Sequence, residues 1–235
     1  MSYHGCRDID CVNQDALHNK GPRVLSESGE RMQIHGRRGW WFPAHANNFS
    51  TRSRTKADIN RIVIHTAEGY TGGLKTFQEP DRGGSAHYAV QWDGQVAQMV
   101  DDKDIAWHAG NWSYNADSIG IEHVGFAHAM EPRRSGSPIA WSQKMLNSSA
   151  WLTAKLAKKY KVPLDREHII GHVEVPSQTH SDPGDNWPWA WYMARVRYYY
   201  YRPWIWGGLA LLMFGVFGKQ VHSRKKRRIQ SWETY

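Results

Sequence analysis

The chain has 235 residues, enough for one sizeable domain with its own hydrophobic core and extra segments at the ends. Its formal net charge of +8 suggests an anionic partner, but residues 219–235 alone carry a net +5. The charge therefore says little about the ligand of the rest of the chain. With only two cysteines, disulfides are not what holds a fold of this length together.

The N-terminal part, residues 1–40, is polar and has no hydrophobic period, so we expect a flexible lead. It lacks the apolar run of a secretory signal peptide. Cys6 and Cys11 lie in this lead. They can form a small disulfide in an oxidising compartment or remain free thiols, and no nearby histidine or cysteine spacing indicates a metal site.

Short strand-like runs and helical stretches alternate between residues 41 and 197, which we assign to one domain. Five runs read as strands, and Asp93-Gly94 between the second and third predicts a tight hairpin turn with two positive φ angles. The 3.6-residue period of apolar side chains predicts a helix over residues 141–160. The expected fold class is α/β, a mixed sheet flanked by helices. The predicted strands are residues 61–66, 87–92, 95–100, 118–122 and 168–171.

The C-terminal part has the composition of a membrane anchor. Residues 203–218 contain no charge, tyrosines precede them, and the basic tail of residues 219–235 follows. We predict a transmembrane helix over residues 198–218, with aromatic and basic side chains at its two interfaces. The alternative is a C-terminal core helix with a solvated basic end. The same basic cluster is better explained by anionic lipid than by nucleic acid, so no nucleic-acid partner is expected.

Thirteen histidines make a search for a metal site worthwhile. His65 ends a hydrophobic strand, where side chains reach the rim of a sheet. His172 follows another short strand, and Asp182 lies ten residues later before a Pro-Gly turn. Two imidazoles and one carboxylate leave a fourth position for water on zinc. The alternative is that Asp182 only caps the turn before Pro183-Gly184.

Five motifs lie in the order and spacing that resemble the type 2 N-acetylmuramoyl-L-alanine amidases, a family that includes phage amidases and the peptidoglycan recognition proteins. The resemblance covers roughly residues 43–195. The motifs are IVIHTAEG, SAHYAVQWDG, AWHAG, SIGIEHVG and GHVEVPSQTHSDPGDNWPW.

This resemblance implies that His65, His172 and Asp182 hold Zn²⁺. It also implies that Glu122, at the end of SIGIE, is the general base that moves protons during amide hydrolysis. His180 stands where many relatives carry a lysine that stabilises the oxyanion. A histidine can act there through an N–H, and we assign it a catalytic role. Some relatives carry a tyrosine just before the histidine of SAHY. In this sequence that position is Ala86.

Several other residues of these motifs have expected roles. Trp107 and His108 are expected to line the substrate groove, and Asn115 either binds the peptide or fixes the loop before SIGIE. His87 is expected to be a structural hydrogen-bonding residue. His123 should point to the face of the sheet opposite Glu122, because side chains alternate along a strand.

The sequence thus predicts a monomeric enzyme that cuts the bond between N-acetylmuramic acid and L-alanine in peptidoglycan. A phage endolysin or a membrane-tethered wall amidase fits best, attached to membrane lipid through its C-terminal segment and acting on the cell wall, on a side of the membrane that the sequence leaves open. The alternatives are a cytoplasmic amidase that recycles muropeptides and a module that binds muramyl peptide without cutting it.

Overall fold

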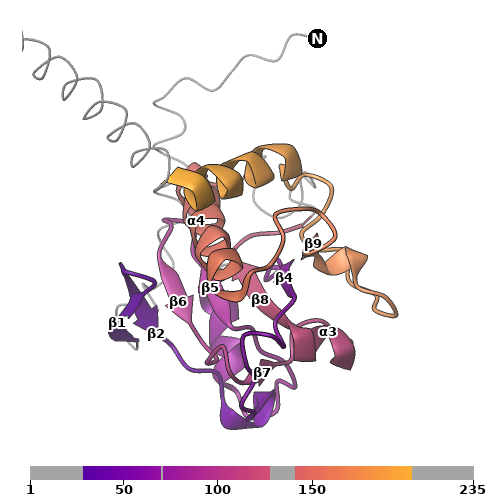
Figure 1. Ribbon diagram of the computed structural model, residues 1–235. Coiled ribbons are helices and arrows are strands. Elements are labelled where there is room, and N and C mark those ends of the chain that lie inside the picture. The colour runs from indigo at the N-terminus through magenta and orange to yellow at the C-terminus, as the bar shows by residue number, and fades with distance from the viewer. Residues whose placement is uncertain (1–28, 70, 128–140, 203–235) are drawn as a thin grey trace, which may run out of the picture.

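The computed structural model describes residues 29–69, 71–127 and 141–202 (Figure 1). Within these ranges seven strands form one mixed sheet in the order β1-β2-β6-β5-β8-β4-β9, and two more form a small ribbon, β3-β7. The strands of the large sheet, in that order, are Glu30–Ile34, Arg37–Trp41, Val96–Gln98, Tyr88–Val90, Ser118–His123, Arg61–Ile64 and Ile169–Gly171. The ribbon pairs β3 (Phe49–Ser50) with β7 (Ile105–Ala106). The predicted mixed sheet with helices is confirmed.

Three neighbouring parallel strands, β8, β4 and β9, form one end of the sheet, with β9 at its edge. β4 pairs in parallel with β8 on one side and with β9 on the other. Ile64, the last residue of β4, is opposite Ile121 of β8 and Gly171 of β9. The carboxyl ends of all three strands therefore meet at one edge, which is where open α/β sheets bind ligands.

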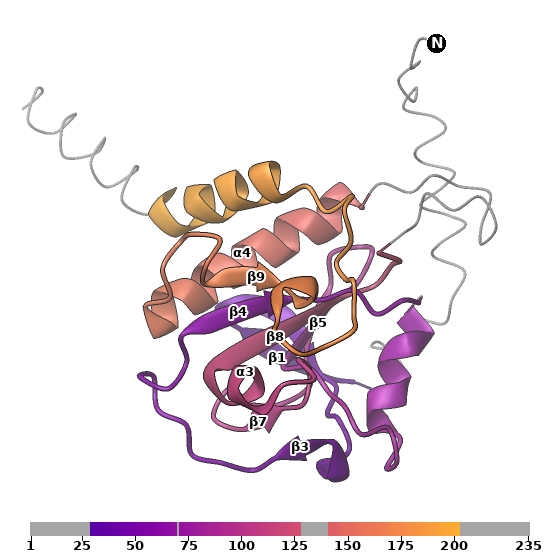
Figure 2. The same cartoon turned by 90° about the vertical axis from the view of Figure 1, so that its right-hand side faces the viewer.

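Helices cover both faces of the sheet. Figure 2 shows α4 (Gln143–Tyr160) and the helix over residues 189–202 together on one face, with α3 (Trp112–Asp117) and the β3-β7 ribbon on the other. The predicted helix over residues 141–160 is thus present, and it ends where Lys161 adopts a left-handed conformation with φ 61°. Three short 3₁₀ segments complete the described elements: η1 (Ala46–Asn48), η2 (Thr71–Gln78) and η3 (His172–Glu174).

The alternation of side chains along β4 and β8 assigns residues to these two faces. Ile62, Ile64, Ile119 and Ile121 belong to the main apolar core with α4, whereas Val63 packs in a separate cluster with Ala109. Because alternate residues share a face, His65 follows Val63 onto the side of α3, and Glu122 follows Gly120 there. His123 lies on the α4 side, as predicted, where its Nε2 is 2.6 Å from Ser149 Oγ.

The hairpin of β5 and β6 is present, but its predicted turn geometry is wrong. Only Gly94 has a positive φ, 84°, whereas both Asp93 and Gly94 were expected to have one. The Asp93 carboxylate accepts a hydrogen bond from the Gln95 backbone N–H at 2.9 Å. This local bond satisfies the turn while Asp93 keeps an ordinary backbone conformation.

The hairpin of β1 and β2 corrects the predicted flexible lead, because residues 30–40 are part of the large sheet. β2 pairs in parallel with β6, and Trp40 Nε1 donates to Gln95 Oε1 at 2.7 Å. Ile34 is 3% exposed and packs over Gly39, where a Cβ would lie 2.5 Å from Ile34 Cδ1. Charged residues on the solvent side of an edge strand concealed the apolar face from sequence reasoning. The rest of the predicted lead, residues 1–28, lies outside the described residues.

The described residues contain no helix that is long and apolar enough to cross a membrane. Residues 198–202, which the sequence assigned to the membrane segment, instead continue the helix that begins at residue 189, and Tyr199 and Tyr200 pack against the core. Residues 203–218 and the basic tail of residues 219–235 lie outside the described residues.

Candidate metal centre and active site

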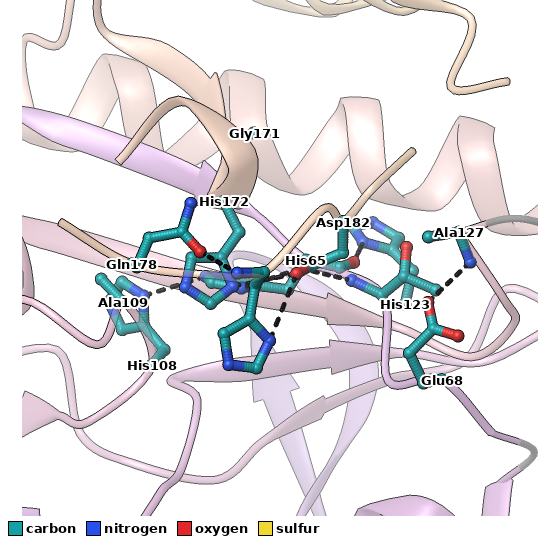
Figure 3. A network of polar contacts seen from close by, with 12 residues as sticks. His65, Glu68, His108, Ala109, His123, Ala127, Gly171, His172, Gln178 and Asp182 are labelled. Atoms are coloured by element: carbon teal, nitrogen blue, oxygen red, sulfur yellow. Dashed lines mark hydrogen bonds and ion pairs between the residues drawn. The ribbon is translucent and has the colours of Figure 1, made fainter. Parts of the chain in front are cut away.

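Three predicted ligands come together at the carboxyl edge of these parallel strands (Figure 3). His65 follows β4, His172 follows β9, and Asp182 lies in the loop after η3. One ligand atom from each residue lies within 4.8 Å of the others, and all three residues are buried. Asp182 Oδ1 lies 3.0 Å from His172 Nδ1, and its Oδ2 lies 3.3 Å from His65 Nδ1. The carboxylate therefore bridges the two imidazoles.

The main chain holds the loop of Asp182 in place. The Thr66 N–H donates to Asp182 Oδ2 at 3.2 Å, and the Val173 N–H donates to the Asp182 carbonyl at 2.9 Å. Gly171 gives the loop room, since a Cβ there would lie 2.6 Å from Pro183 Cδ. Burial by itself would raise the pKa of Asp182, but the hydrogen bond with His172 and the neighbouring imidazole of His65 hold that pKa far below its usual range. Asp182 is therefore an anion at neutral pH.

The donor set fits a divalent cation. Within residues 29–69, 71–127 and 141–202, His172 Nε2 and Glu122 Oε2 are buried and have no hydrogen-bond partner, although such atoms are normally satisfied. Two neutral imidazoles and one carboxylate are the ligand set of catalytic zinc sites with an open position. His65, His172 and Asp182 could therefore hold a metal ion.

Glu122 faces the same cavity from the end of β8. Burial, reinforced by the negative charge of Asp182, raises the pKa of its carboxyl group to about 8. A carboxyl group of raised pKa beside a metal site is a typical general acid or base.

The cavity has a volume of about 290 Å³. Of the predicted site residues, Trp107, His108 and His180 line it together with Glu122 and the three ligands. The His180 ring stacks on the His172 ring at 4.6 Å between centroids, and its Nδ1 lies 3.8 Å from Asp182 Oδ1. Its side chain is 65% exposed, so it lies at the rim and not among the buried ligands.

Asn115 and Trp107 differ in how far they reach the substrate side. Asn115 Oδ1 accepts hydrogen bonds from the backbone N–H groups of His108 at 3.0 Å and Ala109 at 2.7 Å. Asn115 is buried and is not among the residues that line the cavity. Its contacts therefore fix the loop of His108 and do not place it where it would touch a peptide. Trp107 lines the cavity, with its indole N–H donating to Ser50 Oγ at 3.0 Å.

Two buried histidines near the site have structural contacts. His87 Nδ1 accepts from the Gly120 N–H at 3.1 Å, and His123 Nδ1 lies 2.8 Å from the His65 carbonyl oxygen. Burial lowers the pKa of each ring to about 3. Both are neutral at physiological pH and brace the strands that hold His65 and Glu122.

Sequence reasoning missed the residues that shape the cavity without belonging to a metal pattern. Ser118 Oγ hydrogen-bonds with His108 Nε2. The Arg54 guanidinium donates to three backbone carbonyls at the end of α3. Thr66, Glu68 and Arg82 line the cavity. The motifs SIGIE and IVIHTAEG contain three of these five, but nothing in a single sequence separates their roles. Arg54 and Arg82 lie outside the five motifs.

Comparison with known proteins identifies the class of this fold and site. Residues 55–185 match the Amidase_2 family, described as N-acetylmuramoyl-L-alanine amidase. The chain belongs to this family. It is 35% identical over 171 residues to N-acetylmuramoyl-L-alanine amidase A of Achromobacter lyticus, covering 65% of this chain and 89% of that protein.

More distant similarities extend to other members. The chain is 30% identical over 118 residues to the 1,6-anhydro-N-acetylmuramyl-L-alanine amidase AmpD of Citrobacter freundii, covering 48% of this chain and 57% of that protein. It thus spans little more than half the length of AmpD. Among solved structures it is similar to a substrate complex of the amidase AmiD from E. coli, with 22% identity, a TM-score of 0.49, and coverage of 70% of this chain and 65% of that one.

The raised pKa of Glu122 predicts a pH-dependent stability difference between the metal-free wild type and Glu122→Gln. A group whose pKa is higher in the folded state stabilises the fold below its unfolded pKa of about 4.5, and this contribution is lost as pH rises to about 8. From pH 5 to pH 8 the free energy of unfolding of the wild type should therefore fall by roughly 3 kcal/mol relative to Glu122→Gln. Urea unfolding of the metal-free proteins measures this.

Glu79→Gln is the matched control, because Glu79 is exposed. Its stability should follow that of the wild type at both pH values. A difference between wild type and Glu122→Gln that does not change with pH would contradict a buried Glu122 with raised pKa.

Proposed function

We propose that the chain is a zinc-dependent amidase that hydrolyses the bond between N-acetylmuramic acid and L-alanine in peptidoglycan. One observation carries the proposal: three buried ligands and an unpartnered buried carboxyl group face a single cavity. Membership in the N-acetylmuramoyl-L-alanine amidase family supports the bond that is cut. The relative from Achromobacter lyticus is named for this same activity.

Zinc is the metal that the donor set favours. Imidazole nitrogens suit zinc, and one carboxylate leaves the centre a net positive charge. When bound, zinc supplies a water of lowered pKa and polarises the carbonyl of the scissile amide. His65, His172 and Asp182 would hold it.

Glu122 is the proposed proton carrier. Its free Oε2 accepts a proton from the attacking water, and the same carboxyl group then delivers that proton to the leaving nitrogen of L-alanine. A cation at the three ligands would offset the charge of Asp182, which is the second cause of the raised pKa. This would lower the pKa of Glu122 and favour the deprotonated form that acts as a base.

His180 is proposed to stabilise the negative charge that develops on the amide oxygen. It lies at the cavity rim, stacked on His172, so an N–H of its ring can reach a substrate atom bound above the ligands. It stands in place of the lysine of many relatives.

Two alternatives to hydrolysis of the intact wall are an amidase that recycles muropeptides and a recognition module that does not cut. Relatives named 1,6-anhydro-N-acetylmuramyl-L-alanine amidase AmpD favour the first alternative, a cytoplasmic amidase that recycles soluble muropeptides. A recognition module that does not cut is less well supported, because ligands and base are all present. Comparing intact wall with soluble muropeptide as substrate distinguishes wall hydrolysis from recycling.

Glu122→Ala is expected to lower kcat by about 10²- to 10⁴-fold, because it removes the group that moves both protons. Its zinc content should remain that of the wild type, since Glu122 is not a ligand. The measurement is the release of L-alanine amino groups from purified wall, with metal analysis of the same samples. A chelator should abolish wild-type activity, and added Zn²⁺ should restore it.

The matched control is Glu79→Ala, which should retain wild-type activity. A wild-type protein that binds zinc and releases no amino groups would refute the enzyme and favour a recognition module. Full activity of Glu122→Ala would refute the assignment of the base.

His180→Ala should lower kcat by about 10- to 100-fold with little change in KM, because the lost interaction forms in the transition state. His180→Lys should restore most of the lost kcat, because the lysine ammonium group offers N–H donors at the same place. Steady-state kinetics between pH 6 and pH 9 checks both. A raised KM with unchanged kcat would instead assign His180 to ground-state substrate binding.

We propose that the protein is attached to a membrane through residues 203–218 and acts on the cell wall. The support is the sequence: sixteen uncharged residues between tyrosines and a basic cluster. Deleting residues 203–235 should move the protein from the membrane fraction to the soluble fraction while wall hydrolysis by the purified protein continues. Substituting the basic residues of 224–228 with glutamine is a milder second variant. Retention of the deletion variant in the membrane fraction would refute the attachment.

A further inference from the structure

A chain of buried hydrogen bonds leads from His65 away from the cavity. His65 Nε2 lies 3.0 Å from His108 Nδ1, and His108 Nε2 lies 3.2 Å from Ser118 Oγ. The Ser118 hydroxyl in turn donates to the backbone carbonyl of Tyr114 in α3. The three side chains are at most 8% exposed, so water does not compete for these bonds.

The backbone end of this chain fixes the direction of every bond in it. A carbonyl oxygen only accepts, so the single Ser118 proton is directed at Tyr114. Ser118 Oγ must then accept from an N–H at His108 Nε2. A neutral His108 with its proton on Nε2 has a bare Nδ1, which can only accept from His65.

The resulting proton position on His65 matters for the metal site. His65 carries its proton on Nε2, and Nδ1 presents a lone pair toward Asp182 Oδ2 at 3.3 Å. Two electron-rich atoms face each other at this distance, and a cation between them removes the repulsion. The hydrogen-bond chain thus prepares the nitrogen that faces the other two ligands.

The packing of His108 supports a fixed ring orientation. Its ring lies directly on the backbone of Gly120, where a Cβ would be 2.5 Å from His108 Cγ. A side chain at position 120 would displace the ring from both hydrogen-bond partners. Asn115 fixes the main chain of His108 by accepting a hydrogen bond from its backbone N–H. Ring and backbone are therefore held from two directions.

We propose that His108 and Ser118 are positioning residues that hold His65 as its Nε2-protonated tautomer and leave Nδ1 to bind the metal. This differs from the substrate-groove role expected for His108 from sequence. It rests on the proposed function only in that a metal ion occupies the three ligands. Loss of such a partner behind a ligand typically costs 10- to 100-fold in metal affinity.

The test is the Zn²⁺ affinity of the full chain, measured by competition with a chromogenic chelator. Ser118→Ala and His108→Phe should each bind Zn²⁺ about 10- to 100-fold more weakly than the wild type. His108→Asn offers an amide oxygen near the position of Nδ1 and should recover most of that loss. The ¹⁵N spectrum of histidine-labelled, zinc-loaded wild type should show His65 protonated at Nε2.

Ser149→Ala is the matched control. Ser149 is as buried as Ser118 and also contacts a histidine, but its partner is His123 on the other face of the sheet. It should lower stability without changing Zn²⁺ affinity. An equal loss of affinity in Ser149→Ala and Ser118→Ala would show a general effect of destabilisation and overturn the proposal.

Other outcomes separate this proposal from the proposed function. Ligation of His65 through Nε2 in the wild-type spectrum, or wild-type affinity in both Ser118→Ala and His108→Phe, overturns the positioning role whatever the activity. Weakened Zn²⁺ binding in these variants, in a protein that does not release L-alanine amino groups, supports the positioning role and refutes the amidase. If His108→Phe does not fold, Ser118→Ala and the wild-type spectrum still decide.

Discussion

The parallel pairing of β4 with β8 and with β9 is the constraint on which the rest of the site depends. It brings the carboxyl ends of three strands to one edge, where His65 and His172 follow β4 and β9 and Glu122 is the penultimate residue of β8. Side-chain alternation then sends His65 and Glu122 to the same face. A shift of one residue in either register would turn a catalytic group into the apolar core under α4.

The second determinant is burial of polar groups that are left incompletely paired. Glu122 is a buried carboxyl group with a free oxygen, and Asp182 is a buried anion that lies beside two imidazoles. Such groups destabilise the fold unless a cation or substrate completes them. The surrounding sheet and α4, with its continuous apolar core, supply the stability that permits this arrangement.

The buried histidines near the site show how position on the sheet decides role. His65 and His172 face Asp182, His108 lies behind His65, and His123 points to α4. The same imidazole group can be a metal ligand, a positioning residue or a structural hydrogen-bonding residue. The difference lies in which partner meets each ring nitrogen, since that partner fixes the tautomer.

The sequence by itself determined strands β4, β5, β6, β8 and β9, the helix over residues 141–160, the amidase family and the ligand candidates, because hydrophobic period and motif spacing are local properties. It left open whether Asn115 binds peptide or fixes a loop, and it did not predict the contact of His108 with His65. Tertiary structure decided these points, because the role of a side chain depends on atoms distant in the chain, such as His65 for His108. It also decided that residues 30–40 join the sheet, since an edge strand with charged outward residues has no clear hydrophobic pattern. The proton on His65 depends on a carbonyl at Tyr114, 49 positions away in the sequence, and such a contact exists only once the chain is folded.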